Sequence, residues 1–323
     1  MNKILKLVGT IFLTVAFCFS FILNSAEAAD SKTSKAEQKK AMNMFRESLL
    51  ATANDNNQIF HQFFFFMLPD LQSELDFKGK ITGHSLDIAG DFGLWLTDDK
   101  GSITDINVPF YIQQNGDTMT LYYQQKDKKW AKNSMPASLA ELADLVASPT
   151  KQEIDKEISM VKDVTILQDN EKRRTLLVRL DGNKLADEFK LQMNNETVKS
   201  DDKSNPAADE MVNKLFGYID TGLRNADVWY TWKIDKKNHK TGTIVVDLSQ
   251  IIQESALAAL NDPKSELPDE FREMLETMAF YSEFKAYTRL LGPEAQTILT
   301  IPQEVIDTAV EDKEPSLDKI DNK

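Results

Sequence analysis

Cysteine is almost absent from this chain of 323 residues, and its scarcity limits the chemistry open to the protein. The single cysteine, Cys18, lies inside the apolar run Leu7–Leu23 near the N-terminus. Intramolecular disulfide bonds and metal sites built on several thiolates are therefore excluded. A chain of this length can bury a sizeable core without such cross-links.

Histidine and basic residues are also few. The three histidines, His61, His84 and His239, do not have the spacing of a metal site, and His239 lies in a lysine-rich turn where we expect it to be exposed. Lysine and arginine number 38 against 51 aspartates and glutamates, which gives a formal net charge of -13. This acidity argues against nucleic acid as a partner and against electrostatic docking on anionic lipid.

Motifs that carry catalysis are missing as well. The sequence holds no nucleophile elbow, phosphate-binding loop or dinucleotide fingerprint. We therefore expect no catalytic residue, no cofactor and no metal. Carboxylates far apart in sequence can still meet in a fold, so an enzyme is the less favoured alternative to a binding protein.

The N-terminus has the pattern of a Sec signal peptide. Lys3 and Lys6 precede the apolar run, and the small-residue pattern Ala26-Glu27-Ala28 follows it. This pattern predicts cleavage after residue 28 and export to the periplasm or the extracellular side of a bacterial cell envelope. Because the apolar run is long, an uncleaved membrane anchor is the alternative. We divide the rest into a flexible leader over 29–38, one folded domain over 39–310 and a disordered charged tail over 311–323.

Two helices are expected at the start of the folded domain. The first covers 39–53, where apolar residues recur at helical spacing. The second covers the phenylalanine-rich segment Ile59–Leu68, which ends at Pro69. On a helix, most of its apolar side chains would share one wide face.

The period of the pattern changes to two after residue 73. Apolar and polar residues alternate through most of 73–133, and Asn115-Gly116-Asp117 is a strong hairpin turn signal. This pattern predicts an antiparallel meander with one apolar and one polar face. Further on we expect helices over 138–146, 152–161, 185–193, 206–226, 251–260 and 268–280, and strands over 164–167, 175–180, 228–234, 243–248, 284–291 and 297–301, the last two as a final hairpin.

This order of elements resembles the lipoprotein-carrier superfamily, the LolA/LppX-like proteins. The turn segment Asn115–Met119, the stretch Lys128–Trp130 and the ending Ile301–Ile306 are similar to exported bacterial proteins of that group. The resemblance implies an α+β fold: a curved antiparallel β-sheet, an unclosed half-barrel, with helices covering the concave face. It also implies lipid or lipoprotein handling, although no stretch matches a functional residue of the family.

The candidate ligand-binding residues are apolar. If the phenylalanine-rich segment lines or closes an apolar cavity, its side chains would contact an acyl chain together with the even-numbered residues of 86–112. The competing interpretation is that the segment fills the half-barrel as ordinary core, and the same choice applies to the strand around Trp232. The cavity candidates are Phe60, Phe63, Phe64, Met67, Phe92, Leu94, Phe110 and Trp232.

Two functions follow from these observations. The first is an envelope binding protein that holds a lipid or a lipoprotein acyl chain in the half-barrel. The second is a structural or regulatory protein with a packed core, which would recognise an envelope protein through an exposed apolar patch or an unpaired sheet edge. The first requires a cavity, and the second requires an exposed patch or edge.

Overall fold

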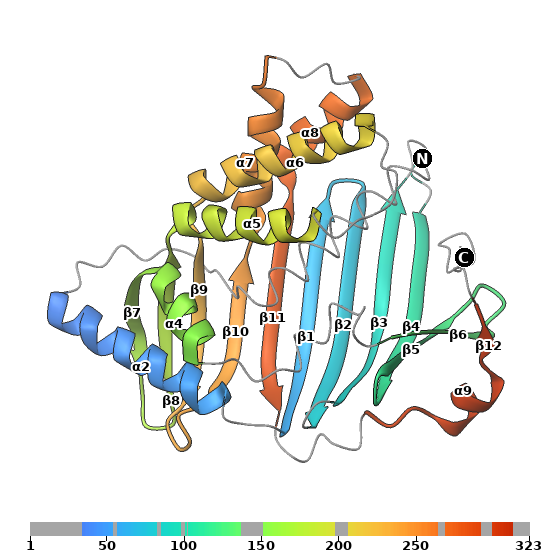
Figure 1. Ribbon diagram of the computed structural model, residues 1–323, viewed down its shortest axis with the longest axis horizontal. Coiled ribbons are helices and arrows are strands. Elements are labelled where there is room, and N and C mark those ends of the chain that lie inside the picture. Colours follow the sequence, from blue (N-terminus) through green and yellow to red (C-terminus); the bar gives the residue numbers. More distant parts are fainter. Residues whose placement is uncertain are drawn as a thin grey trace.

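A single curved sheet organises the molecule (Figure 1). The computed structural model describes residues 34–53, 57–82, 85–97, 101, 103–136, 151–197, 206–263, 269–291 and 299–312. Within these ranges twelve strands form one sheet in the order β12-β6-β5-β4-β3-β2-β1-β11-β10-β9-β8-β7. The fold is α+β, as predicted, because the helices lie outside this sheet rather than alternating with parallel strands.

Strands β1 to β6 follow one another in sequence and in space. Each pairs antiparallel with the next, which confirms the predicted meander and extends it at its N-terminal end by one strand. The β4–β5 turn places Gly116 at a φ of 60°, a conformation that glycine adopts without steric cost. The six strands are β1 (Asn57–Leu68), β2 (Leu71–Thr82), β3 (Ser85–Thr97), β4 (Ile103–Asn115), β5 (Thr118–Gln124) and β6 (Trp130–Pro136).

The other half of the sheet carries most of the helices. Strand β11 pairs with β1 on one side and with β10 on the other, so it joins the two halves. The strands of this half are β7 (Val161–Asp169), β8 (Arg173–Leu180), β9 (Trp229–Asp235), β10 (Thr241–Asp247) and β11 (Glu283–Leu291). The helices are α2 (Lys35–Ala53), α4 (Lys151–Met160), α5 (Gly182–Thr197), α6 (Pro206–Asn225), α7 (Ser249–Leu260) and α8 (Asp269–Tyr281).

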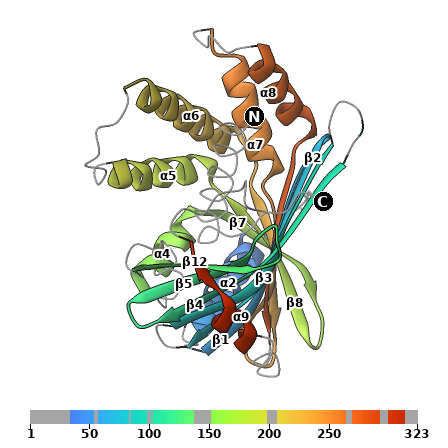
Figure 2. The ribbon, with the colours of Figure 1, turned by 90° about the vertical axis from the view of Figure 1, so that its right-hand side faces the viewer.

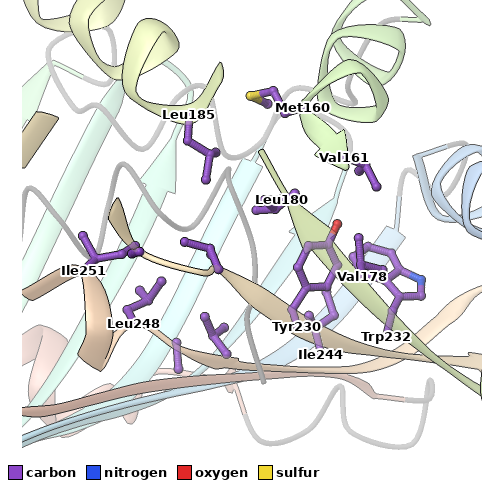
Figure 3. Close-up of a cluster of buried hydrophobic side chains, with 14 of the residues drawn as sticks. Met160, Val161, Val178, Leu180, Leu185, Tyr230, Trp232, Ile244, Leu248 and Ile251 are labelled. Atoms are coloured by element: carbon purple, nitrogen blue, oxygen red, sulfur yellow. The ribbon is translucent and has the colours of Figure 1, made fainter. Parts of the chain in front are cut away.

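The helices cover the concave side of β7–β11, and the main core lies beneath them (Figures 1 and 2). Phe45 of α2 is fully buried, with its ring 5.0 Å from that of Trp232 and 6.0 Å from that of Tyr230. The indole nitrogen of Trp232 donates to Ser48 Oγ at 3.0 Å. In Figure 3 Tyr230 and Trp232 lie beside Val178 in this cluster. Trp232 is therefore packed core rather than the wall of a cavity.

The phenylalanine-rich segment is a strand, so the predicted helix over Ile59–Leu68 is wrong. It forms β1, which is paired along almost its whole length with both β2 and β11. Its side chains therefore alternate between the two faces of the sheet. Phe64 and Phe66 enter the main core, while Phe63 and Phe65 lie on the opposite, convex face.

The C-terminal segment crosses the convex face and closes one edge of the sheet. Leu299 packs against Ile59, and Val305 of α9 (Gln303–Thr308) packs near Tyr122. The chain then forms β12 (Val310–Glu311), which pairs parallel with β6. The predicted hairpin between 284–291 and 297–301 is wrong, because β11 pairs with β1 and β10 and the described part of 297–301 is not a strand.

Asp312 holds this C-terminal segment in place. Its carboxylate accepts hydrogen bonds from the Tyr123 hydroxyl at 2.5 Å and from Gln125 Nε2 at 3.1 Å, and its carbonyl accepts from Asn133 Nδ2 at 2.8 Å. Burial and the nearby Asp312 carboxylate both raise the pKa of Tyr123 well above its usual value.

We expect Asp312→Ala to destabilise the protein by about 1–3 kcal/mol, because it leaves the buried Tyr123 hydroxyl without its acceptor. Tyr123→Phe removes the other partner, and the double variant should cost less than the two single losses combined. Urea denaturation of the three variants measures this coupling. Strict additivity would show that the hydrogen bond does not hold the C-terminal segment.

Several sequence predictions lie outside the described residues. These are the signal peptide over 1–28, the helix over 138–146, His84 and the tail from residue 313 onward. Part of the predicted leader is ordered, because α2 begins at Lys35, and the chain is also described at Glu311 and Asp312. In the described part of the chain no helix has the length and hydropathy needed to cross a bilayer.

Candidate functional site

The concave face of β1–β5 is the candidate site, and we call it the open face. Paired residues in neighbouring strands share a face, so the register defines its members. Across one row, Phe64 stands opposite Leu75, which stands opposite Phe92, which stands opposite Val108. Its larger apolar members include Phe60, Phe64, Leu75, Phe77, Ile81, Leu86, Ile88, Phe92, Leu94, Ile106, Val108, Phe110, Ile112 and Leu121.

No charged side chain lies on the described part of the open face. The charges of β1–β4 are on the convex face, where His61 Nε2 lies 2.7 Å from Asp76 Oδ1. On that face burial, and then the nearby Asp76 carboxylate, raise the pKa of Asp91. This separation follows from the period of two, which sends alternate residues to opposite faces.

The open face is less covered than the rest of the concave surface. Figure 1 shows α2 and α4 in front of β7–β10, whereas none of the described helices lies over the middle of β2–β4. Accordingly Phe77, Phe92 and Phe110 are only half-buried, while Tyr230 and Trp232 on β9 are 1% and 3% exposed. Apolar side chains are therefore available on this half of the sheet.

Two glycines keep aromatic rings close to the open face. A β-carbon on Gly79 would lie 2.1 Å from Cζ of Phe60, and one on Gly90 would lie 2.4 Å from Cβ of Phe77. Glycine is therefore needed at Gly79 for the close approach of the Phe60 ring to the backbone, and at Gly90 for the close approach of β3 to β2 at Phe77. The Phe60 and Phe77 rings meet edge to face with centroids 6.2 Å apart, and Phe64 stacks on Phe77 at 6.3 Å. Together the three rings form a continuous aromatic floor.

The structure brings together most of the predicted site residues. Phe60, Phe64, Phe92, Leu94 and Phe110 all lie on the open face, with the even-numbered residues of β3 and β4. Trp232 shares the concave side but is buried under α2, as described above. Phe63 and Met67 lie on the convex face, because β1 is a strand and not a helix.

Sequence reasoning missed a polar spot beside the open face. Gln62 of β1 and Thr288 of β11 stand directly opposite each other on the concave side. Gln62 is polar but only 7% exposed, and along its strand it lies between Phe60 and Phe64. The sequence did contain a signal for this spot. In a strand, Gln62 falls between Phe60 and Phe64 on one face, so it lies in the middle of the apolar side chains.

A second, smaller feature lies where α8 meets the β1–β2 turn. An open pocket of about 360 Å³ is lined by Met67, Pro69, Gln253 and the segment Phe280–Glu283. Phe280 and Tyr281 are 68% and 64% exposed beside it. This pocket does not include the aromatic floor, although Met67, one of the predicted cavity residues, lines it.

The sheet edges are poorly suited to accepting another strand. Edge strand β7 has two register shifts against β8, between Val161 and Asp163 and between Ile166 and Gln168. Bulges of this kind protect edges against pairing. At the opposite edge β12 covers Ala131 and Lys132 of β6. Partner recognition through an unpaired edge therefore finds little support in this geometry.

The histidines do not form a chemical site in the described part of the molecule. His61 pairs with Asp76 on the convex face. His239 lies at a turn with a φ of 60° and is exposed, as predicted. Among the described residues no group of three or more histidine, cysteine, aspartate or glutamate side chains could hold a metal ion.

Comparison with known proteins gives one kind of match. No protein-family model matches the sequence, and no curated protein sequence matches it. Among solved structures, the chain is similar to the crystal structure of LprF from Mycobacterium bovis, with a TM-score of 0.39 and 10% sequence identity over 82% of this chain and 98% of that chain. At this identity the likeness concerns the path of the chain and not the chemistry of its residues.

Proposed function

We propose that this protein is an exported cell-envelope binding protein that holds a lipid or a lipoprotein acyl chain on the open face. The observation that carries the proposal is a wide concave apolar surface on which Phe77, Phe92 and Phe110 are half-buried and no described member is charged. Soluble proteins seldom expose large contiguous apolar surfaces unless a ligand or partner covers them. An acyl chain fits such a surface because its binding needs contact and exclusion of water rather than charge.

The energetics favour a long chain. Each methylene removed from water contributes about 0.8 kcal/mol before the cost of immobilising the ligand. Five strands spaced about 4.8 Å apart give the open face a width of about 19 Å. Several methylenes can therefore contact the sheet at once, and affinity should rise with chain length until the face is covered.

Export is part of the proposal. The basic, apolar and small-residue segments of 1–28 fit a Sec signal peptide. An acyl chain needs a protein carrier wherever it must cross an aqueous space, and the periplasm or the outer envelope is such a space. The proposed role is binding and not catalysis.

Native mass spectrometry with lipid extraction tests the proposal. The protein would comprise residues 29–323, purified without detergent from a host that exports it. We expect a co-purifying lipid in the unmodified protein and at least about a tenfold loss of occupancy in Phe92→Gln, because this change puts a polar amide on the open face. Phe63→Gln is the matched control, because it makes the same change on the convex face and should leave occupancy unchanged.

A lipid-free mass, together with no uptake of offered fatty acids or phospholipids, would contradict the proposal. If both variants lose lipid occupancy equally and their circular dichroism spectra change, the variants are misfolded. Lipid uptake by the unmodified protein would then decide whether the proposal holds. The protein without a ligand would fit the alternative of an envelope interaction protein, and the exposed Phe280 and Tyr281 would be the first surface to test.

A further inference from the structure

The polar spot formed by Gln62 and Thr288 contains a buried hydrogen-bonding group without a partner. The hydroxyl oxygen of Thr288 is buried and has no hydrogen-bond partner. Gln62 stands directly opposite Thr288 and is only 7% exposed, so its side chain lies beside this unpaired hydroxyl. A buried hydroxyl without a partner and a neighbouring amide side chain therefore share one spot on the concave side of the sheet.

Their surroundings make this costly. Along β1 Gln62 lies between Phe60 and Phe64, and across the sheet it stands opposite Phe77. On the other side of Thr288 the paired residue is Ile244. A buried polar group without a partner costs about 1–3 kcal/mol. Natural proteins keep such groups where a ligand or water completes the hydrogen bonds.

The two groups set limits on the ligand. The glutamine amide offers two donor hydrogens and an acceptor oxygen, and the threonine hydroxyl offers one donor and an acceptor. The described strands β1–β6 and β11 place no lysine, arginine, histidine or carboxylate on the concave face, and the Asp312 carboxylate that reaches Tyr123 lies at the far, β5–β6 edge. A charged head group would be buried here without compensation.

We propose that Gln62 and Thr288 anchor an uncharged oxygen of the ligand, an ester carbonyl or a hydroxyl, whose acyl chain extends across the aromatic floor toward β4. This inference rests on the proposed function and names the class of ligand. The direction of the chain follows from packing. On the β10 side of Thr288 the concave surface is filled by buried Ile244 and Trp232, while on the β2 side it is open at half-buried Phe77.

Equilibrium dialysis against probes of equal chain length tests the anchor. The probes are decanol, methyl decanoate, decanoate, decylamine and decane, and the protein is the mature chain stripped of lipid. At neutral pH we expect decanol and methyl decanoate to bind about tenfold more tightly than decanoate and decylamine. The double variant Gln62→Leu/Thr288→Val should weaken binding of the two neutral polar probes about tenfold and leave that of decane unchanged or stronger.

A matched double variant controls for the loss of polar groups in a strand. Gln72→Leu/Thr231→Val makes the same chemical changes on the convex face and should leave all five affinities unchanged. If the unmodified protein binds decane as tightly as decanol, and the Gln62/Thr288 variant changes neither, the anchor is refuted while the proposed function stands. If it binds none of the probes, the anchor and the proposed function both fail. Equal weakening of all five probes would also refute the anchor.

Discussion

Replacing Phe45 by alanine is expected to destabilise the protein by about 3–5 kcal/mol. Phe45 is fully buried where α2 crosses the sheet, and its ring contacts both Tyr230 and Trp232. Truncation removes the ring and leaves a cavity between helix and sheet that the strands of β8–β10 cannot close without losing their pairing. Urea denaturation, with the free energy of unfolding extrapolated to water, measures the effect.

The control for this prediction is Phe280→Ala. Phe280 is the same residue type but is 68% exposed at the end of α8, so its loss should change the free energy of unfolding by less than about 0.5 kcal/mol. A loss below about 1 kcal/mol at Phe45 would mean that α2 is not part of the cooperative core.

Glu157 is the second position with a large expected effect. It lies on α4 midway between Ile154 and Met160, two buried residues three positions away on either side, so it shares the helix face that packs inward. Burial raises the pKa of its carboxyl group to about 7. Burial, and then the charge of Glu157, in turn raise the pKa of Tyr230 on β9.

The direction of the pH dependence follows from this shift. The pKa in the folded protein lies above the ordinary value of 4.5, so the native state holds this proton more tightly than the unfolded state does. The full stability is therefore present below about pH 4.5 and is lost as the pH rises through about 7. Between these limits the loss attributable to Glu157 is about 3 kcal/mol.

Chemical denaturation across this pH range, on the unmodified protein and on Glu157→Gln, isolates the contribution. The glutamine variant cannot ionise, so the difference between the two proteins should grow with pH in favour of the variant. Other charges near α4 are present in both proteins, namely the Arg46–Asp155 pair toward α2 and the Lys156–Glu188 pair toward α5. A constant difference across the range would show that Glu157 is not buried in the folded state.

The meander could be predicted from the sequence because its two faces differ in chemistry. Along β2 and β3, charged residues such as Asp76, Lys78 and Asp91 alternate with apolar ones, and this period of two excludes a helix. The turn at Gly116 then fixed the register of β4 against β5. Amphipathic helices such as α6 were predictable for the same reason, at a period of 3.6.

Strand β1 could not be identified in this way. It lies at the centre of the sheet, with Phe64 and Phe66 in the core on one face and Phe63 and Phe65 on the other. Apolar residues on both faces leave a continuous apolar run without a period, and its length favours a helix. The pairing of β1 with β11 joins segments more than two hundred positions apart, and no local pattern encodes such a contact.

The residues of the candidate site were predicted only in part, because the period of two is visible in β3 and β4 but not in β1. The residues on β3 and β4 were correctly grouped, since their alternation was visible in the sequence. On β1 the helical interpretation combined Phe63 with Phe64 and overlooked Gln62, whereas strand geometry separates the first two and places Gln62 on the concave side. Because this segment was assigned the period of a helix, two of its four proposed cavity residues, Phe63 and Met67, lie on the wrong face of the sheet.

The position of β1 also has a consequence for how the protein folds. Strands β1 to β6 are consecutive hairpins with local contacts, which form quickly. Strand β11 can pair with β1 only after most of the chain has been synthesised. Until then the phenylalanine-rich strand, central in the finished sheet, is an exposed edge. Long apolar edges promote aggregation. The early meander should accordingly depend on a chaperone until β11 docks, and the yield of folded protein should fall when docking is slowed.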